Sequence, residues 1–170
     1  PDVSRVIRTV VFAKPNLIFL FDQVELASKA LPVQIRFFPD HRDEKSQIEV
    51  GDTDFQIKRP GARLFGKVAS TGKFQMRTSL LEPMPKRPDY EYDPRDKTVG
   101  QEFGDFPFAE IYLEAAQHHA MVTALIAVPG KEGPAPAAEV KRIEEGWYCR
   151  SAEFSCFIDA SGPVAEVHLP

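Results

Sequence analysis

Four side chains in one proline-rich segment have the types that recognise acidic sugars. Residues 82–105 contain Arg87, Tyr90, Tyr92 and Arg95. Aromatic faces stack on sugar rings, and guanidinium groups pair with carboxylates or sulfates through two parallel hydrogen bonds. A long irregular loop inside a compact domain is usually either functional or disordered. The four residues therefore predict a substrate-binding loop, and a solvated loop that binds nothing is the alternative.

The histidines do not indicate a metal site. His118 and His119 are adjacent, and on a strand adjacent side chains point to opposite faces, so the two cannot bind one ion together. His41 lies between Asp40 and Asp43 in a charged turn that could bind a hard or borderline ion. A solvated turn is the simpler interpretation. We predict no metal site and no cofactor.

Asp22 is predicted to be a structural acid. It follows the apolar run 17–21 and shares a strand face with aliphatic side chains. A carboxylate in that position needs hydrogen-bond partners or a cation, because an unpaired buried charge is costly. Arg5 or Arg8 on the neighbouring strand could supply the cation. We favour this structural role over a catalytic one.

The sequence has no strong catalytic motif. It contains no glycine-rich phosphate loop, no Gly-x-Ser-x-Gly elbow and no Cys-x-x-Cys pair. The formal net charge of -4 gives no electrostatic reason to expect nucleic acid as a partner. No segment reaches the roughly 20 apolar residues of a membrane-spanning helix. We therefore expect neither nucleic acid nor a membrane among the partners.

The two cysteines are predicted not to form a disulfide bond with each other. Cys149 and Cys156 are seven positions apart. On one continuous strand an odd separation places side chains on opposite faces, where they could not form a bridge. Two such thiols say little about the redox compartment.

The elements that must position these residues are short strands. Residues 33–37, 74–80 and 109–114 alternate apolar with polar side chains, which is the period of a strand with one buried face. The chain has 15 prolines, which disfavours long helices. The sequence therefore predicts a single all-β domain over 1–170, an antiparallel β-sandwich of about a dozen short strands.

Two segments depart from this alternation. Residues 17–21 and 121–128 are apolar on both faces. They fit either central strands of a lone sandwich or strands whose outer surface is covered by another domain. We favour the second interpretation, since exposed apolar patches usually mark interfaces. Residues 136–145 could form a helix or a strand, and we favour a strand.

Three stretches resemble the heparinase II/III-like polysaccharide lyases. Residues 5–24 are similar to a hairpin of that family whose second strand ends in an aspartate, here Asp22, followed by a polar and an aliphatic residue. Residues 32–39 are similar to the next strand. Residues 55–66 and then 119–125 continue the match, so strand order and spacing agree over most of the chain.

The resemblance implies an accessory domain without catalytic residues. Members of the family carry an N-terminal helical toroid followed by antiparallel sheets, and they cleave uronate-containing glycans by β-elimination. The Tyr and His groups that this chemistry requires lie upstream of the matched region. Some members bind zinc, but Phe37 and Phe38 stand where a later His ligand is expected. The implied partner is therefore the N-terminal helical catalytic domain of the same polypeptide, and the implied location is periplasmic or secreted.

Two other functions remain open. A free-standing carbohydrate-binding module would bind a glycan without a catalytic partner, and a purely structural sandwich would bind none. The two-sided apolar strands favour the accessory domain, because they suggest a missing partner surface. The chain also begins abruptly at Pro1, which suggests a piece of a longer protein. An acidic polysaccharide is a possible ligand, and the isolated chain is expected to be inactive as an enzyme.

Overall fold

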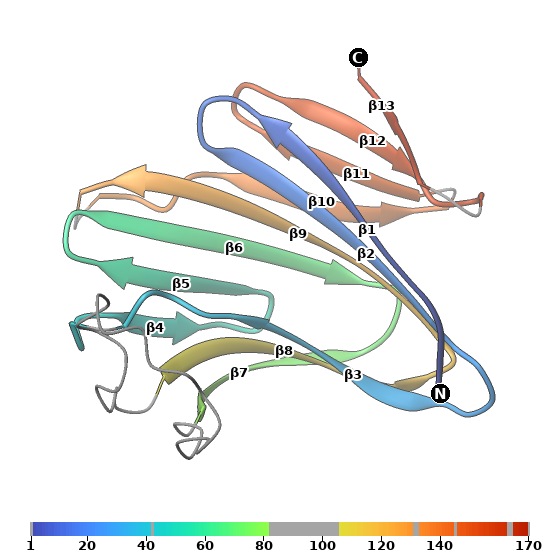
Figure 1. The fold of residues 1–170 in the computed structure, drawn as a ribbon. Helices are drawn as coiled ribbons and strands as arrows, with labels where there is room; N and C mark the ends of the chain where they lie inside the picture. The colour runs from blue at the N-terminus through green and yellow to red at the C-terminus, as the bar shows by residue number, and fades with distance from the viewer. Residues whose placement is uncertain are drawn as a thin grey trace, which may run out of the picture.

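The described part of the chain folds into antiparallel β-strands (Figure 1). The computed structural model describes residues 2–41, 43–81, 106–130, 133–144, 146–162 and 165–169. The strands are β1 (Val3–Ala13), β2 (Leu17–Leu26), β3 (Leu31–Phe37), β4 (Gln47–Val50), β5 (Asp54–Arg59), β6 (Ala62–Ser70), β7 (Phe74–Leu81), β8 (Phe106–Ala116), β9 (His118–Pro129), β10 (Ala138–Ile143), β11 (Gly146–Ser151), β12 (Ser155–Asp159) and β13 (Glu166–His168). Within these ranges, no helix is long and apolar enough to cross a membrane.

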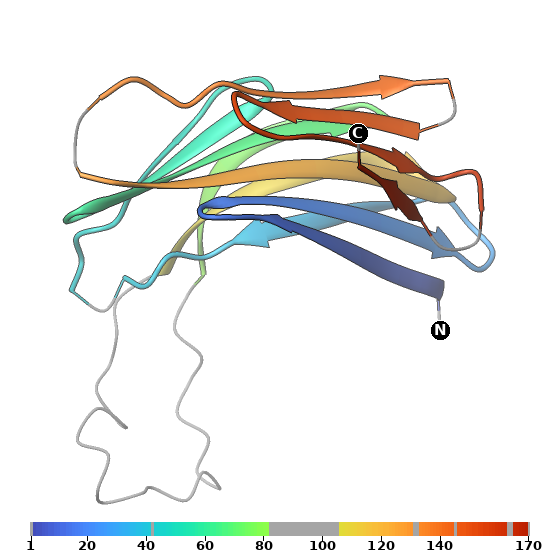
Figure 2. The same cartoon turned by 90° about the horizontal axis from the view of Figure 1, so that it is seen from above.

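The strands form three sheets (Figures 1 and 2). The central sheet has the order β1-β2-β9-β6-β5-β4, the upper sheet has the order β10-β11-β12-β13, and the lower sheet has the order β3-β8-β7. The predicted all-β antiparallel fold is thus confirmed. Because the upper and lower sheets pack on opposite faces of the central sheet, the sandwich has three layers.

The first core lies between the central and upper sheets. Phe19 and Phe21 of β2 and Val122 of β9 are almost completely buried there. They pack with Trp147 of β11 and Ile158 of β12, which point down from the upper sheet. The ring centroids of Phe21 and Trp147 are 6.2 Å apart.

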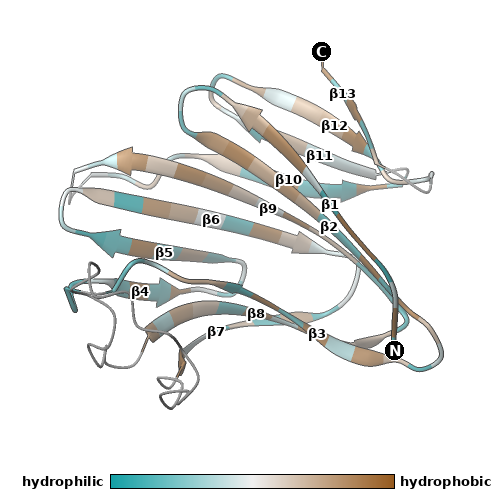
Figure 3. Cartoon of the chain, viewed as in Figure 1, coloured by the Kyte–Doolittle hydropathy of each residue, from teal (hydrophilic) through white to brown (hydrophobic). Residues whose placement is uncertain are grey.

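The second core lies between the central and lower sheets. Leu20 of β2 and Met121 and Leu125 of β9 reach it from the central sheet, and Ile111 and Leu113 of β8 reach it from below. Alternate side chains of a strand point to opposite faces, so a strand between two layers is apolar at successive positions. Figure 3 shows this difference: β2 and β9 are largely hydrophobic, whereas β4 and β5 carry more hydrophilic residues.

The two predictions about these strands have different outcomes. The expectation that another domain covers the apolar segments 17–21 and 121–128 was wrong, because the chain's own sheets cover both faces. The preference for a strand within 136–145 is confirmed by β10.

The premise of the cysteine prediction was wrong, although both cysteines are free thiols in the structure. It assumed one continuous strand, but the chain turns back after Ser151 and re-enters the upper sheet as β12. Cys149 of β11 and Cys156 of β12 are therefore direct partners in the antiparallel register. Both side chains are buried in the core between the upper and central sheets.

Candidate functional site

The predicted loop residues lie in a part of the chain that the structure does not describe. Arg87, Tyr90, Tyr92 and Arg95 all lie outside the described residues. Their role as a substrate-binding set therefore stays a prediction. The site described below consists of other residues, and it lies on the lower sheet.

The outer face of the lower sheet carries two rows of polar side chains. The register of β3, β8 and β7 places Tyr112 opposite both Gln34 and Gln75. One step along, the same register places Glu110 opposite both Arg36 and Arg77. Alternate residues of the same strands, such as Ile111, point into the core instead. We call the following six residues the arginine face: Gln34, Arg36, Gln75, Arg77, Glu110 and Tyr112.

A buried carboxylate holds the two guanidinium groups of this face. Arg36 Nε donates to Glu110 Oε2 at 2.8 Å, and Arg77 Nε donates to Glu110 Oε1. The Glu110 side chain is only 3% exposed, whereas those of Arg36 and Arg77 are 37% and 46% exposed. Burial alone would raise the pKa of Glu110, but the hydrogen bonds and charges of the two arginines outweigh it, so this pKa is lowered. The carboxylate therefore stays ionised beneath its two partners.

Aromatic rings and an amide further restrict the two arginines. The Arg77 guanidinium lies 4.6 Å from the centroid of the Tyr112 ring, and that of Arg36 lies 4.8 Å from the Phe108 centroid. Arg36 Nη2 also donates to Gln34 Oε1 at 2.7 Å. The Nη groups of Arg77 have no hydrogen-bond partner within the part of the chain that the structure describes. These N–H groups are therefore held in place and free to bind a ligand.

The chemistry of the arginine face suits an anionic, hydroxylated ligand. Two guanidinium charges against one carboxylate leave one positive charge in excess. A planar guanidinium offers paired donors to a carboxylate or sulfate, while glutamine amides and the tyrosine hydroxyl match sugar hydroxyls. Among the described residues there is no group of three or more His, Cys, Asp or Glu side chains that could hold a metal ion.

Sequence reasoning missed this arrangement, although a signal was present. Gln-x-Arg occurs in both flanking strands, at 34–36 and 75–77, and Glu-x-Tyr occurs at 110–112 in the strand between them. The alternation assigned these side chains to solvated faces. The order β3-β8-β7, which brings the three motifs side by side, does not follow from the order of the strands along the chain.

A second candidate region lies on the central sheet. A cleft of about 500 Å³ is bounded by β4, β5, β6 and the segment 135–138. Phe65 and Gln56 line it, and Lys67 donates from Nζ to Thr53 Oγ1 at 2.8 Å and to Asp54 Oδ2 at 3.1 Å. We call this region the cleft.

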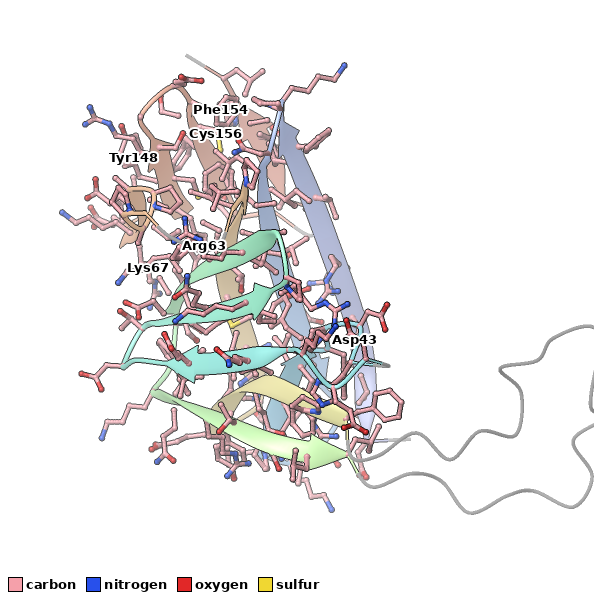
Figure 4. The ribbon with its side chains drawn as sticks, turned by 90° about the vertical axis from the view of Figure 1, so that its left-hand side faces the viewer. Asp43, Arg63, Lys67, Tyr148, Phe154 and Cys156 are labelled. Atoms are coloured by element: carbon pink, nitrogen blue, oxygen red, sulfur yellow. The ribbon has the colours of Figure 1, made fainter. Side chains whose placement is uncertain are left out.

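The charged side chains around the cleft are satisfied by neighbours. Lys58 Nζ lies 2.5 Å from Glu49 Oε1, and Arg63 Nη1 donates to the Gly133 carbonyl oxygen at 2.8 Å. Figure 4 views this side of the molecule and places Arg63 below Tyr148 of the upper sheet. The cleft therefore offers an aromatic ring and an amide rather than cations free to bind an anion.

Asp22 is buried and paired. It accepts from Arg8 Nε at 2.5 Å and from Arg8 Nη2 at 3.0 Å, across the β1–β2 register. The hydrogen bond to Asp22 raises the pKa of Arg8. Of the two cations expected on the neighbouring strand, Arg8 is the partner, and Arg5 pairs with Glu25 instead. These contacts give Asp22 a structural environment.

The adjacent histidines point to opposite faces of β9, as predicted. His118 is exposed, whereas His119 is buried and its Nε2 lies 3.0 Å from the Leu31 carbonyl oxygen. His119 thus links the central sheet to the start of β3. In the charged turn around His41, Asp43 pairs with Arg59.

Comparison with known proteins adds no family. No family model matches the chain. No curated protein matches its sequence either.

Proposed function

We propose that this chain is a carbohydrate-binding β-domain that holds an acidic glycan on the arginine face. The observation that carries the proposal is the pair Arg36 and Arg77, fixed by one buried carboxylate beside a tyrosine ring and two glutamine amides. Guanidinium groups that are ordered before binding lose little conformational entropy when an anion arrives. The cleft supports glycan binding less well, because its cations already have partners.

The glycan is expected to lie along a flat surface. The two rows of the arginine face are consecutive outward positions of the same strands, so they are about 7 Å apart. Tyr112 and the two amides can contact a sugar ring while the arginines bind the acidic group of that sugar or of its neighbour. On binding, sugar hydroxyls replace water at the amides, and the carboxylate of the sugar replaces water at the guanidinium groups.

Affinity electrophoresis in gels containing polygalacturonate tests the proposal. The double substitution Arg36→Gln/Arg77→Gln should weaken binding at least about 10-fold, since hydrogen bonds to charged groups contribute about 1.5–3 kcal/mol each. Arg142→Gln/Arg150→Gln on β10 and β11 is the matched control, because it removes the same two charges from exposed positions elsewhere. Equal binding by the double variant and the wild type would overturn the proposal.

A second double variant separates the arginine face from the predicted loop. Tyr90→Ala/Tyr92→Ala removes the aromatic rings of the loop set. If the arginine face is the site, this variant retains most of the affinity. If the loop is the site, the loop variant loses binding and the arginine variant does not.

As a second function, we propose that the chain is an accessory domain of a polysaccharide lyase that cleaves uronate-containing glycans. Its support is the exposed face of the edge strand β1, where Val6, Val10 and Phe12 are 65%, 57% and 56% exposed and Arg8 lies among them. Such a face is a natural contact for the predicted N-terminal helical catalytic domain. The isolated chain should then produce no unsaturated sugar from polygalacturonate, and measurable β-elimination by it alone would contradict the accessory role. A periplasmic or secreted location stays a prediction.

A further inference from the structure

The upper sheet contains two cysteines that the proposed glycan binding does not use. Cys149 and Cys156 are 0% and 2% exposed and are direct partners in the β11–β12 register. Directly opposed residues of antiparallel strands have Cα atoms about 4.5–5.5 Å apart. That separation lies inside the range of about 4.4–6.8 Å found in disulfides.

The two free thiols are close enough to affect each other's ionisation. The pKa of Cys149 is raised and that of Cys156 is lowered, each chiefly by the other thiol. Both side chains point from the upper sheet toward the central sheet, as do the neighbouring register partners Trp147 and Ile158. Figure 4 labels Cys156 in this part of the upper sheet, near Phe154. The sulfur atoms therefore need only a small movement to bond.

A tight turn fixes this pairing. The Ser151 N–H donates to the Phe154 carbonyl oxygen at 2.7 Å and closes the hairpin just beyond the cysteines. A shift of the register by one residue would turn Trp147 and Ile158 out of the core, so the hydrophobic pattern opposes it. The register that opposes the two cysteines is thus required by the packing of the whole upper sheet.

We propose that Cys149 and Cys156 form an oxidisable dithiol that closes to a cross-strand disulfide between β11 and β12. With a small-molecule disulfide such as oxidised glutathione as the oxidant, the protein gains one S–S bond and the glutathione S–S bond breaks. The two thiol protons and two electrons of the protein pass to two glutathione thiols. This inference is independent of the proposed glycan binding.

The environment of the pair decides when the reaction occurs. The neighbouring Cys156 thiol and burial raise the pKa of Cys149, whereas the Cys149 thiol lowers the pKa of Cys156, so Cys156 is the thiol that ionises first and can attack a disulfide. Oxidant must also reach side chains that are almost fully buried. The bond should therefore form while the upper sheet is open or folding, and it should then be protected.

Refolding in a glutathione redox buffer tests the proposal. The reduced chain is refolded with mixed oxidised and reduced glutathione, quenched with acid, alkylated and weighed by intact mass spectrometry. The expected product has lost two hydrogen atoms and takes up no alkylating reagent. The same buffer with concentrated urea is the matched control, where the unfolded chain should remain mostly reduced or carry glutathione.

Single variants identify the bond. Cys149→Ser and Cys156→Ser should each retain one thiol that alkylates, and peptide mapping of the wild type should recover the two cysteines as one linked peptide. The oxidised chain should also melt about 5 °C higher than the reduced chain, because the bond closes a loop in the unfolded state. Two alkylated cysteines after refolding, or a linkage between two chains, would overturn the proposal.

Discussion

The arginine face and the cleft both lie beside charged side chains on β-sheets, yet they are built differently. In the arginine face a single buried carboxylate, Glu110, organises two partly exposed cations. Around the cleft each cation has its own partner, and these partners are more exposed, as the 61% exposed side chain of Glu49 illustrates. Ion pairs near the surface contribute little to stability, whereas a buried charge left unpaired is costly. The arginine face should therefore couple ligand binding to stability, and the cleft should not.

The largest effect is expected from Glu110→Ala. The substitution removes the carboxylate that holds Arg36 and Arg77 and leaves two like charges side by side. We expect about 3 kcal/mol lower unfolding free energy, measured by urea denaturation, because two hydrogen bonds between charged groups are lost at about 1.5–3 kcal/mol each. Glu49→Ala beside the cleft is the matched control and should change stability by less than about 1 kcal/mol. Similar losses in the two variants would abolish the distinction between the regions.

A smaller effect is expected from Gly66→Ala at the floor of the cleft. A Cβ atom placed there would lie 2.1 Å from the Phe55 ring, which crosses this strand to fill the lower core. Overpacking of this kind lowers the unfolding free energy by about 1–3 kcal/mol, which a lower melting temperature would show. Gly72→Ala is the control, because nothing lies within 4 Å of its added Cβ. An unchanged melting temperature for Gly66→Ala would show that the cleft floor can relax.

The sequence predicted the strands of this fold but not its three layers. The strands were predictable because alternation in segments such as 33–37 directly reflects one buried and one solvated face. The three layers could not be predicted. An apolar run such as 121–128 has the same sequence pattern whether a second domain or a distant strand of the same chain covers it. The opposed cysteines were missed for a related reason: separation along the chain gives the relative direction of side chains only while one strand continues.

The arginine face itself shows the same limit. Arg36 and Arg77 were both assigned to solvated faces, and their exposed side chains agree with that assignment. Their common partner Glu110 could not be chosen without the sheet order, because β3 and β7 are separated along the chain by three central-sheet strands. Contacts between strands distant in sequence are thus the information that the pattern lacks.

The arginine face and the cleft should also differ in how their carboxylates affect stability at acid pH. The lowered pKa of Glu110 means that its carboxylate stabilises the fold above the ordinary glutamate pKa, and this contribution is lost as the pH falls through the lower folded-state value. Glu110→Gln should therefore flatten the dependence of melting temperature on pH in the acid range. Glu49→Gln should leave that dependence close to the wild type. An unchanged acid slope in Glu110→Gln would assign the loss of stability to other carboxylates.

The smallest effect is expected from Lys58, which pairs with Glu49 beside the cleft. Lys58 Nζ and Glu49 Oε1 are 2.5 Å apart, but their side chains are 31% and 61% exposed, so water competes with the pair. Lys58→Met should change the unfolding free energy by less than about 1 kcal/mol in dilute buffer, and added salt should reduce the difference further. Urea denaturation at low and high salt measures both quantities. A loss that is large and insensitive to salt would mean that the cleft, like the arginine face, is organised around a charge that solvent does not screen.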